Sequence, residues 1–355
     1  MKTWDVIIVG AGIIGLSLAR ELQKSGAKVL VVERGEPGRE ASSAAAGMLV
    51  DAPDETLPAL QLLASASARM HPEFVHELQD ESGVNVDLRD QGTIVLTRDE
   101  NPTATPKTSL TPENLAQLEP SIRDVKLCAV LLKERSVDPR ALTSAALKAV
   151  RHRGVDISSG TTVTDLLLTN GKVSGVVTEK SQYYAPVVVN CAGAWAGTFA
   201  SHRFPTRPVR GQMLAVIGGP KLQHVVRSPE VYLVPRTNGR ILIGSTVEEA
   251  GYNKRTDRET IQRLHHAAVR LVPAMAQARI LEDWAGLRPG TPDNLPILGA
   301  TSTPGYFVAA GHFRDGILLT PVTALLMAQV ICGRRQEFDI TAFSPARFSS
   351  ETTAA

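Results

Sequence analysis

The chain has 355 residues, and its 38 Lys and Arg residues against 36 Asp and Glu residues give a net charge of +2. So small a charge excludes strong long-range attraction to nucleic acid or to an anionic membrane as the main function. With 43% hydrophobic and 21% charged residues the composition is that of a globular protein, and the length predicts two domains or one large composite. The three cysteines lie far apart and form no CxxC pair, which argues against a disulfide framework or a zinc site and favours a reducing cytoplasm.

The N-terminal segment predicts a strand, a glycine-rich turn, a helix and a second strand. Residues 5–9 form a continuous apolar run, as expected of a strand buried on both faces. The turn from Gly10 to Gly15 follows, helical spacing continues to residue 24, and a second apolar run ends at Glu33. The apolar stretch 6–19 is broken by glycines and is too short to span a bilayer, so we predict no signal or membrane segment there.

The next elements alternate between helix, strand and loop. We predict a helix over residues 57–81, half-buried antiparallel strands over 84–97 and a solvated loop over 101–111. Asp138 and Pro139 predict the cap and first residue of another helix. Asn170-Gly171 predicts a tight hairpin turn.

The second half of the chain returns to strands before a last helix. We predict an apolar strand over residues 184–190, a set of antiparallel strands over 207–248 and a helix over 257–272. A loop rich in Gly and Pro is predicted over 286–299, and a further buried strand over 306–310. A second hairpin turn is predicted at Asn238-Gly239, and Thr320 is predicted to cap the last helix.

The glycine-rich turn carries the first functional signal. A lone GxGxxG is weak evidence, but this one follows a buried strand and opens a helix, and an acidic residue, Glu33, ends the next strand. Gly10 permits the tight turn, Gly12 lets the backbone approach a pyrophosphate, and Gly15 allows close helix–strand packing. The helix N-terminus attracts phosphate, and Glu33 can accept the ribose hydroxyls of an AMP group. The pattern therefore predicts an adenine dinucleotide, with a purely structural turn as the alternative.

Residues 42–48 form a second unusual segment, because all of them are small apart from Met48. Small residues are expected where a backbone comes close to a flat or charged group. A long, buried cofactor with a ring system would explain the run, and a tightly packed loop is the alternative.

The second hairpin predicts a candidate binding surface. A two-residue loop would pair Tyr232 with Ser245 and Glu230 with Val247. Because side chains alternate between the faces of a strand, these four residues are predicted to share one surface. The Tyr232 hydroxyl could bind a substrate carboxylate there, and ordinary sheet packing is the alternative.

Two arginines, Arg288 and Arg314, lie in glycine-rich segments beside apolar strands. A guanidinium in such a place can bind a carboxylate with two hydrogen bonds, which lysine cannot do. A surface ion pair or a tie to a loop carbonyl is the alternative for each. No HExxH, GxSxG or GxxxxGK[ST] motif is present, so we expect no metal, and hydrolase and nucleoside-triphosphate chemistries are poorly supported.

Four segments together resemble one enzyme family. Val9-Gly-Ala-Gly-Ile-Ile-Gly15, Ser43-Ala-Ala-Ala-Gly-Met-Leu49, Trp284-Ala-Gly-Leu-Arg-Pro-Gly-Thr291 and Ala310-Gly-His-Phe-Arg-Asp-Gly-Ile-Leu318 look like the glycine oxidase branch of the D-amino-acid-oxidase-like FAD-dependent amine oxidoreductases. The resemblance spans nearly the whole chain. It implies non-covalently held FAD and oxidative deamination of glycine, sarcosine or small D-amino acids to the 2-oxo acid, ammonia and hydrogen peroxide. It also implies a role in supplying the thiazole ring of thiamine.

The implied fold is α/β. A discontinuous, Rossmann-like FAD-binding domain (1–83, 135–204 and 284–355) carries an inserted α+β substrate-binding domain built on an antiparallel sheet (84–134 and 205–283). The segment 97–120 is shorter than the resemblance leads us to expect, so we expect a helical piece of the substrate domain to be missing.

The resemblance also assigns roles to residues. It places Arg288 on the substrate carboxylate with Tyr232 as its helper, and Arg314 at the substrate and the flavin. Glu230, Val247 and Met48 are expected in the substrate pocket, although an acid at position 230 departs from the family pattern. Together with the glycine motif, it predicts these FAD contacts: Gly10, Gly12, Ile13, Ile14, Gly15, Glu33, Arg34, Ser42, Ser43, Ala46, Gly47, Met48, Val163, Gly193, His312, Phe313, Arg314, Asp315, Gly316, Ile317 and Leu318.

Three rival functions remain open from the sequence. The protein could be a dehydrogenase that passes electrons to a quinone or a carrier, an oxidase that prefers sarcosine or D-amino acids, or a non-catalytic flavin-binding subunit. In the favoured interpretation its partners are a small amino acid and molecular oxygen, without nucleic acid or membrane. A cytoplasmic homo-oligomer is expected.

Overall fold

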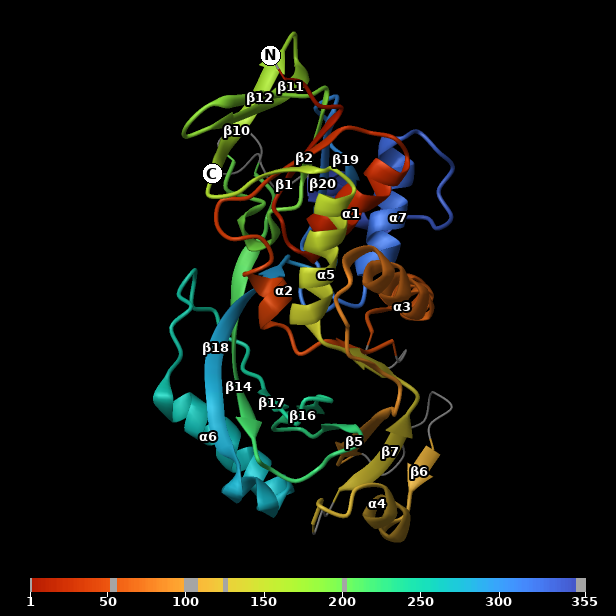
Figure 1. The fold of residues 1–355 in the computed structure, drawn as a ribbon, viewed down its shortest axis with the longest axis vertical. Coiled ribbons are helices and arrows are strands. Elements are labelled where there is room, and N and C mark those ends of the chain that lie inside the picture. Colours follow the sequence, from red (N-terminus) through yellow and green to blue (C-terminus); the bar gives the residue numbers. More distant parts are fainter. Residues whose placement is uncertain (1, 52–55, 99–107, 124–126, 200–202, 349–355) are drawn as a thin grey trace.

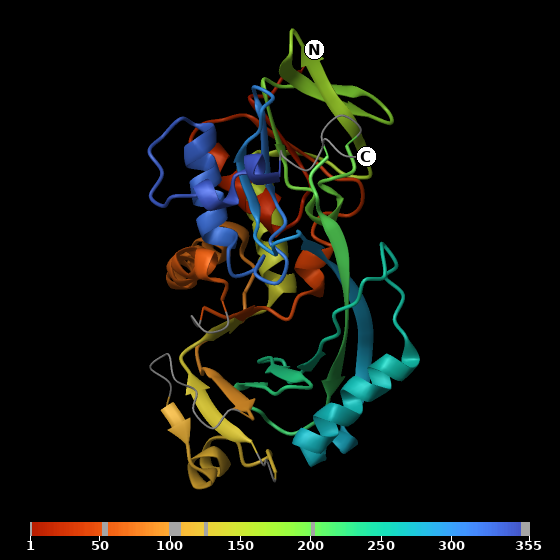
Figure 2. The ribbon, with the colours of Figure 1, turned by 180° about the vertical axis from the view of Figure 1, so that it is seen from behind.

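The computed structural model describes residues 2–51, 56–98, 108–123, 127–199 and 203–348. Two large sheets occupy opposite ends of the molecule, and the long strands β14 (Arg207–Ile217) and β18 (Arg279–Gly290) extend from one end toward the other (Figures 1 and 2). The arrangement is the predicted α/β fold, with a Rossmann-like sheet and a second sheet that is mainly antiparallel.

The first sheet has six strands in the order β19-β20-β13-β1-β2-β9. All neighbours are parallel except β19, which pairs antiparallel with β20. In this order the strands are Ile297–Ala300, Tyr306–Ala310, Val187–Asn190, Val6–Val9, Val29–Val32 and Asp156–Ser158. The strands β1 and β2 are buried on both faces, as their continuous apolar sequence predicts.

Helices cover one face of this sheet and a small sheet covers the other. The helices are α1 (Ile13–Lys24), α3 (Gln61–Ser82), α5 (Pro139–His152) and α7 (Thr320–Ile331), and they share an apolar core with the strands. Strands β10 (Val163–Thr169), β11 (Lys172–Thr178) and β12 (Gln182–Tyr184) form the small sheet, which packs on the opposite face. Asn170 and Gly171 both have positive φ at the turn between β10 and β11, so the first predicted hairpin is confirmed.

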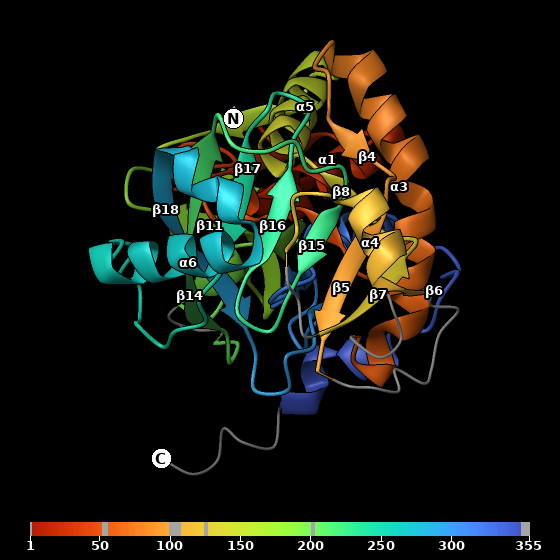
Figure 3. The same cartoon turned by 90° about the horizontal axis from the view of Figure 1, so that it is seen from below.

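The second large sheet has eight strands in the order β18-β14-β17-β16-β15-β5-β7-β6. Besides β14 and β18, it contains Ile241–Gly244, Tyr232–Pro235, Val225–Arg227, Thr93–Thr97, Cys128–Leu132 and Thr108–Leu110, given in sheet order. Figure 3 shows α6 (Arg258–Leu271) and α4 (Pro112–Leu118) over one face of this sheet, where they enclose a separate apolar core.

Short elements complete the fold. Strands β3 (Met48–Leu49), β8 (Arg135–Val137) and β4 (Leu88–Arg89) form a three-stranded sheet, and α2 (Ala41–Ala44) precedes β3. The remaining turns are 3-10 helices: Pro58–Leu60, Gly193–Trp195, Pro273–Gln277, Thr341–Phe343 and Pro345–Phe348. Within the described ranges, no helix combines the length and the apolar character that crossing a membrane requires.

The second hairpin differs from its prediction by one residue. Its loop has three residues rather than two, since the Arg236 N–H donates to the Arg240 carbonyl and Gly239, at φ +80°, donates back to Arg236. A type I turn followed by a left-handed glycine favours this longer loop over the two-residue turn. Tyr232 consequently lies opposite Gly244 and not opposite Ser245.

Three further predictions of local structure were wrong. The strand β18 continues to Gly290, so Arg288 lies in a strand and not in a loop; Pro289 is tolerated there because β18 is an edge strand. Part of the predicted loop 101–111 is strand β6, while residues 101–107 lie outside the described residues. Thr320 is the first residue of α7 rather than its cap, and its hydroxyl donates to the Gly316 carbonyl at 2.6 Å.

Candidate functional site

A cavity of about 720 Å³ lies where the carboxyl ends of β1, β13 and β20 meet the eight-stranded sheet. In a parallel α/β sheet this edge is the usual ligand site, because the loops that follow neighbouring strands open there. The cavity also reaches β14, β16, β17 and β18 of the second sheet. Both sheets therefore contribute residues to one elongated space.

The glycine turn between β1 and α1 forms one end of the cavity. Gly10 has φ +106°, and a Cβ there would meet the Cys191 carbonyl oxygen at 2.5 Å. Gly12 precedes α1, which has no side-chain cap of its own. A Cβ on Gly15 would overlap the Gly10 carbonyl, so Gly15 permits close helix–strand packing and does not itself line the cavity.

Glu33 ends β2 at the cavity wall. Its Oε2 accepts the Ala11 N–H at 2.8 Å and its Oε1 accepts the Gly35 N–H at 2.9 Å, so two backbone donors fix the carboxylate. Each oxygen keeps a further lone pair for a hydroxyl group. The guanidinium of Arg34 lies 3.5 Å from the centre of the Trp195 ring.

The run of small residues passes along the cavity with several carbonyls turned outward. The Trp284 indole donates to the Ala44 carbonyl at 3.1 Å, and the buried Arg236 guanidinium donates to the Ala46 carbonyl. Because a trans peptide directs its C=O and the following N–H to opposite sides, the N–H groups of Ala45 and Gly47 point away from Trp284 and Arg236. Arg236 was not predicted as a site residue, since it follows strand β16 and contacts this run from 190 positions away in the chain.

The loop between β20 and α7 forms the opposite wall. The Phe313 N–H donates to the Pro289 carbonyl at 3.0 Å, which ties this loop to β18 beside Arg288. Burial lowers the pKa of His312 to about 4, and its Nε2 lies 3.2 Å from the Thr323 hydroxyl. Burial also raises the pKa of Asp315 to about 6, with Arg314 acting in the opposite direction.

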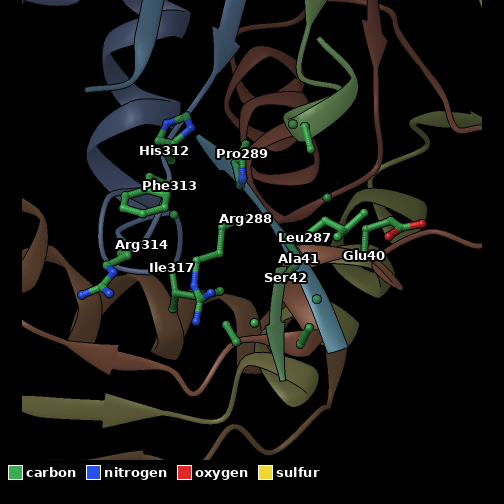
Figure 4. A pocket seen from close by; sticks show the side chains of 18 of the residues that line it. Glu40, Ala41, Ser42, Leu287, Arg288, Pro289, His312, Phe313, Arg314 and Ile317 are labelled. Atoms are coloured by element: carbon green, nitrogen blue, oxygen red, sulfur yellow. The ribbon is translucent and has the colours of Figure 1, made fainter. Parts of the chain in front are cut away.

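Arg288 projects from β18 into the cavity (Figure 4). Its Nη2 donates to Ser245 Oγ at 2.7 Å and its Nη1 donates to the Thr246 carbonyl at 3.0 Å. A Cβ on Gly211 would collide with the guanidinium, so the absence of a side chain makes room for it. Burial lowers the pKa of Arg288, and the nearby Arg314 acts in the same direction. Among the described residues, no carboxylate forms an ion pair with Arg288.

Tyr232 and Arg314 lie near this guanidinium. The Tyr232 side chain covers Gly244, where a Cβ would lie 2.7 Å from the hydroxyl oxygen and 2.8 Å from the ring carbon Cζ, and the hydroxyl donates to Met213 Sδ at 3.6 Å. Burial raises the pKa of Tyr232, so the hydroxyl keeps its proton near neutrality. Arg314 comes from the opposite wall, and Figure 4 shows Arg288, Arg314 and Ile317 together at the cavity.

Most of the predicted site residues line this cavity. They are Gly10, Gly12, Ile13, Ile14, Glu33, Arg34, Ser42, Ala46, Gly47, Met48, Val163, Gly193, Glu230, Tyr232, Arg288, and His312, Phe313, Arg314, Asp315, Gly316 and Ile317. Gly15, Ser43 and Leu318 lie behind the lining residues.

The predicted surface shared by Glu230, Tyr232, Ser245 and Val247 was wrong in part: the first three residues line the cavity, but the shifted hairpin register displaces Val247. Val247 is 51% exposed and does not line the cavity. Glu230 lines it, but its carboxylate pairs with Arg270 at an exposed position. Neither residue therefore lies beside the Tyr232 hydroxyl as predicted.

Sequence reasoning assigned no role to several residues that shape the site. Gly211, Met213 and Gly244 lie on strands of the eight-stranded sheet, and Arg227 is bound at the cavity by Glu134 at 2.9 Å. Their positions depend on strand pairing between distant segments, so no local motif marks them. For the two glycines, the only available signal was their position inside apolar strand patterns.

The cavity fits the predicted dinucleotide. Gly10 and Gly12 line the cavity without side chains, Glu33 can accept ribose hydroxyls, and the small residues Ala44–Ala46 border the same space. The space continues past these groups to Arg288, so it can hold a long cofactor and a small substrate together.

Comparison with known proteins agrees with this geometry. The model of the family described as FAD dependent oxidoreductase (DAO) matches residues 5–330. The solved structure of glycine oxidase from Geobacillus kaustophilus is similar with a TM-score of 0.92 and 32% identity, covering 98% of this chain and 99% of that one.

Two curated relatives extend the comparison. The bifunctional protein ThiO/ThiG of Synechocystis is 35% identical over 99% of this chain, but the chain spans only 55% of that relative. The hydrogen cyanide synthase subunit HcnC of Pseudomonas aeruginosa is 31% identical, covering 99% of this chain and 98% of the relative.

Proposed function

Because the chain belongs to the DAO family of FAD-dependent oxidoreductases and is of the glycine oxidase type, we propose that it oxidises glycine and other small amino acids or amines. The proposed products are the 2-oxo acid, hydrogen peroxide and ammonia, with methylamine in place of ammonia when sarcosine is the substrate. FAD, when bound, supplies the two-electron acceptor, and molecular oxygen is the proposed final oxidant.

The observation that carries this proposal is the buried Arg288 guanidinium without a carboxylate partner in the described part of the chain. A buried cation is costly unless an anion pairs with it, and the guanidinium geometry suits a bidentate carboxylate. Arg288 is therefore proposed to bind the substrate carboxylate, with the protonated Tyr232 hydroxyl as a second donor.

The remaining chemistry is proposed to be mainly positioning. With the carboxylate fixed, the Cα–H of a small amino acid is held in one orientation. His312 and Tyr232 are poor proton acceptors at neutral pH, because burial lowers the pKa of the first and raises that of the second. The substrate is proposed to react with its amine already neutral.

The roles of the individual residues are proposals of the same kind. Glu33, the Gly10–Gly12 turn and residues 42–48 are proposed to hold FAD, and Arg314 is proposed to contact both substrate and flavin. The division into an FAD-binding domain and a substrate-binding domain, the homo-oligomer, the cytoplasmic location and the link to thiamine synthesis remain predictions from the sequence.

One experiment tests the proposed function. The yellow holoenzyme is mixed without air with glycine, sarcosine or D-alanine while its visible spectrum is followed. Bleaching by at least one of the three is expected, and admitted air should restore the colour with one hydrogen peroxide per substrate. If none of the three bleaches the flavin, the proposed substrate class is wrong.

The same experiment separates the alternative functions. In a dehydrogenase, the bleached enzyme would stay reduced in air and regain its colour with a quinone. Because the relative HcnC is named a hydrogen cyanide synthase subunit, cyanide is measured alongside the 2-oxo acid and the amine. Cyanide in place of glyoxylate and ammonia would overturn the proposed products.

A further inference from the structure

The loop 311–319 has one face toward the cavity and one face toward α3. Gly316 and Ile317 line the cavity, whereas none of the residues of α3, all of which the structure describes, does so. The helix α3 therefore lies behind the loop as seen from the cavity. Its contacts with the loop are polar as well as apolar.

Two buried side chains of α3 bind carbonyls of this loop. The Ser67 hydroxyl donates to the Leu318 carbonyl at 2.6 Å. The His71 Nε2 lies 3.2 Å from the Ile317 carbonyl and 3.1 Å from the Leu318 carbonyl. Ser67 and His71 are four positions apart, so they lie on one face of the helix, and both are fully buried.

These contacts fix the protonation of His71. Both neighbours of Nε2 are carbonyl oxygens, which only accept, so Nε2 carries the proton. Nδ1 has no hydrogen-bond partner in the described part of the chain. Burial lowers the pKa of His71 to about 4, with the two carbonyls acting in the opposite direction, so the ring is neutral at physiological pH.

The outward carbonyls determine where the N–H groups of the loop point. Thr320 binds the Gly316 carbonyl, and His71 binds the Ile317 carbonyl. In a planar trans peptide the following N–H points the opposite way, so the Ile317 N–H points away from the Thr320 hydroxyl and the Leu318 N–H points away from His71 of α3. Neither N–H has a backbone partner among the described residues.

We propose that Ser67 and His71 are positioning residues for the flavin: from outside the cavity they hold the carbonyls of Ile317 and Leu318, and so keep the N–H of Ile317, which lines the cavity, pointing at the bound isoalloxazine ring. Fixed donors aimed at a group that gains negative charge stabilise that charge without reorganisation. The two side chains touch neither FAD nor substrate and act only through the loop. The inference rests on FAD binding in this cavity, and not on which amine is oxidised.

The test compares variants of the full-length holoenzyme by their affinity for sulfite, which adds to oxidised flavin and reports the stabilisation of negative charge on the ring. His71→Leu removes the donor, and His71→Gln keeps an N–H at a similar reach. His76→Leu makes the same change at an exposed histidine of the same helix and serves as the matched control. Losing one hydrogen bond of about 1.4 kcal/mol predicts a sulfite Kd about tenfold higher for His71→Leu.

His71→Gln and His76→Leu are expected to stay within about twofold of the parent sulfite Kd. The rate constant for anaerobic reduction by the best substrate should fall in His71→Leu while its KM is unchanged. If His71→Leu lowers the melting temperature but leaves sulfite affinity and reduction rate unchanged, the residue is only structural and the proposal is wrong.

Ser67→Ala provides a second variant if His71→Leu does not fold. It should also raise the sulfite Kd, but by a smaller factor than His71→Leu does, because His71 still binds the Leu318 carbonyl. An unchanged sulfite Kd in this variant would also contradict the proposal. Since sulfite binding needs no amine, these results test the proposal even if the proposed substrate class is wrong.

Discussion

At the scale of single residues, Arg288 carries the largest expected effect. Replacing it with alanine would remove the proposed bidentate partner of the substrate carboxylate, a loss of about 2–4 kcal/mol. We expect KM for the best substrate to rise at least about thirtyfold while the protein stays yellow. Steady-state kinetics measure this, with Arg335→Ala, at an exposed position, as the control. An unchanged KM would show that Arg288 does not bind the substrate carboxylate.

Glu33 makes a second residue-scale prediction. Glu33→Gln keeps the size of the side chain but turns an amide NH₂ toward one of the two backbone donors, Ala11 or Gly35, that now bind the carboxylate. We expect FAD to bind about tenfold to a hundredfold more weakly, as measured by titrating the apoprotein with FAD. Glu36→Gln, at an exposed glutamate, should leave the Kd unchanged. Equal Kd values for both variants would exclude a role of Glu33 in FAD binding.

Whether the sequence predicts the role of such residues depends on how far apart in the chain their contact partners lie. The Gly10–Gly15 turn and Glu33 follow local rules of chain geometry, and the structure brings them together as those rules predict. Ser245 and His71 follow no such rule, because their partners lie 43 and 246 positions away. For these residues the type of side chain says nothing until the strands and helices are paired.

At the scale of elements, Glu81 of α3 connects three helices. Its carboxylate binds Arg20 of α1 at 2.5 Å and Arg153, just after α5, at 2.5 Å. Burial alone would raise the pKa of Glu81, but the hydrogen bonds from Arg153 and Arg20 outweigh it and lower the pKa to about 2. This carboxylate therefore stabilises the fold above its unfolded pKa of 4.5, and the contribution disappears as the pH falls toward 2.

Glu81→Gln tests this junction. At pH 7 we expect the free energy of unfolding to fall by about 3 kcal/mol, because Arg20, which is fully buried, and Arg153 each lose a charged partner, while Arg20 keeps Glu77 and Glu21. The difference from the parent protein should shrink between pH 4.5 and pH 2, as the parent's own carboxylate takes up a proton. Denaturant titrations at several pH values measure it. A difference that does not depend on pH would point to lost packing instead of lost charge.

Among the helices and strands, those with a strong hydrophobic periodicity in the sequence were predicted best. The helix over 57–81 and its end at Gly83 were confirmed within a few residues, since Gly83 adopts the left-handed conformation that ends helices. The strand β18 was missed in part, because Gly286, Pro289 and Gly290 read as a loop unless the strand is known to lie at an edge. The hairpin register failed by one residue, and that error misplaced Val247.

At the scale of the whole molecule, FAD is expected to stabilise the fold. The cavity draws its walls from both large sheets, so only the assembled structure offers the complete binding site. Free FAD at a hundredfold above its Kd should add about 2.7 kcal/mol to the free energy of unfolding, which corresponds to a few degrees in melting temperature. Thermal unfolding of the apoprotein with increasing FAD measures this. A melting temperature independent of FAD would show that the ligand does not depend on the folded cavity.

The contacts of Arg288 with Gly211 and of Tyr232 with Gly244 limit how this pocket can be redesigned. In both places an aromatic or cationic group rests directly on main-chain atoms, with no side chain beneath it that could be shortened. Enlarging the pocket for bulkier amines must therefore begin at Met48 and Met213, whose flexible thioethers border the same space.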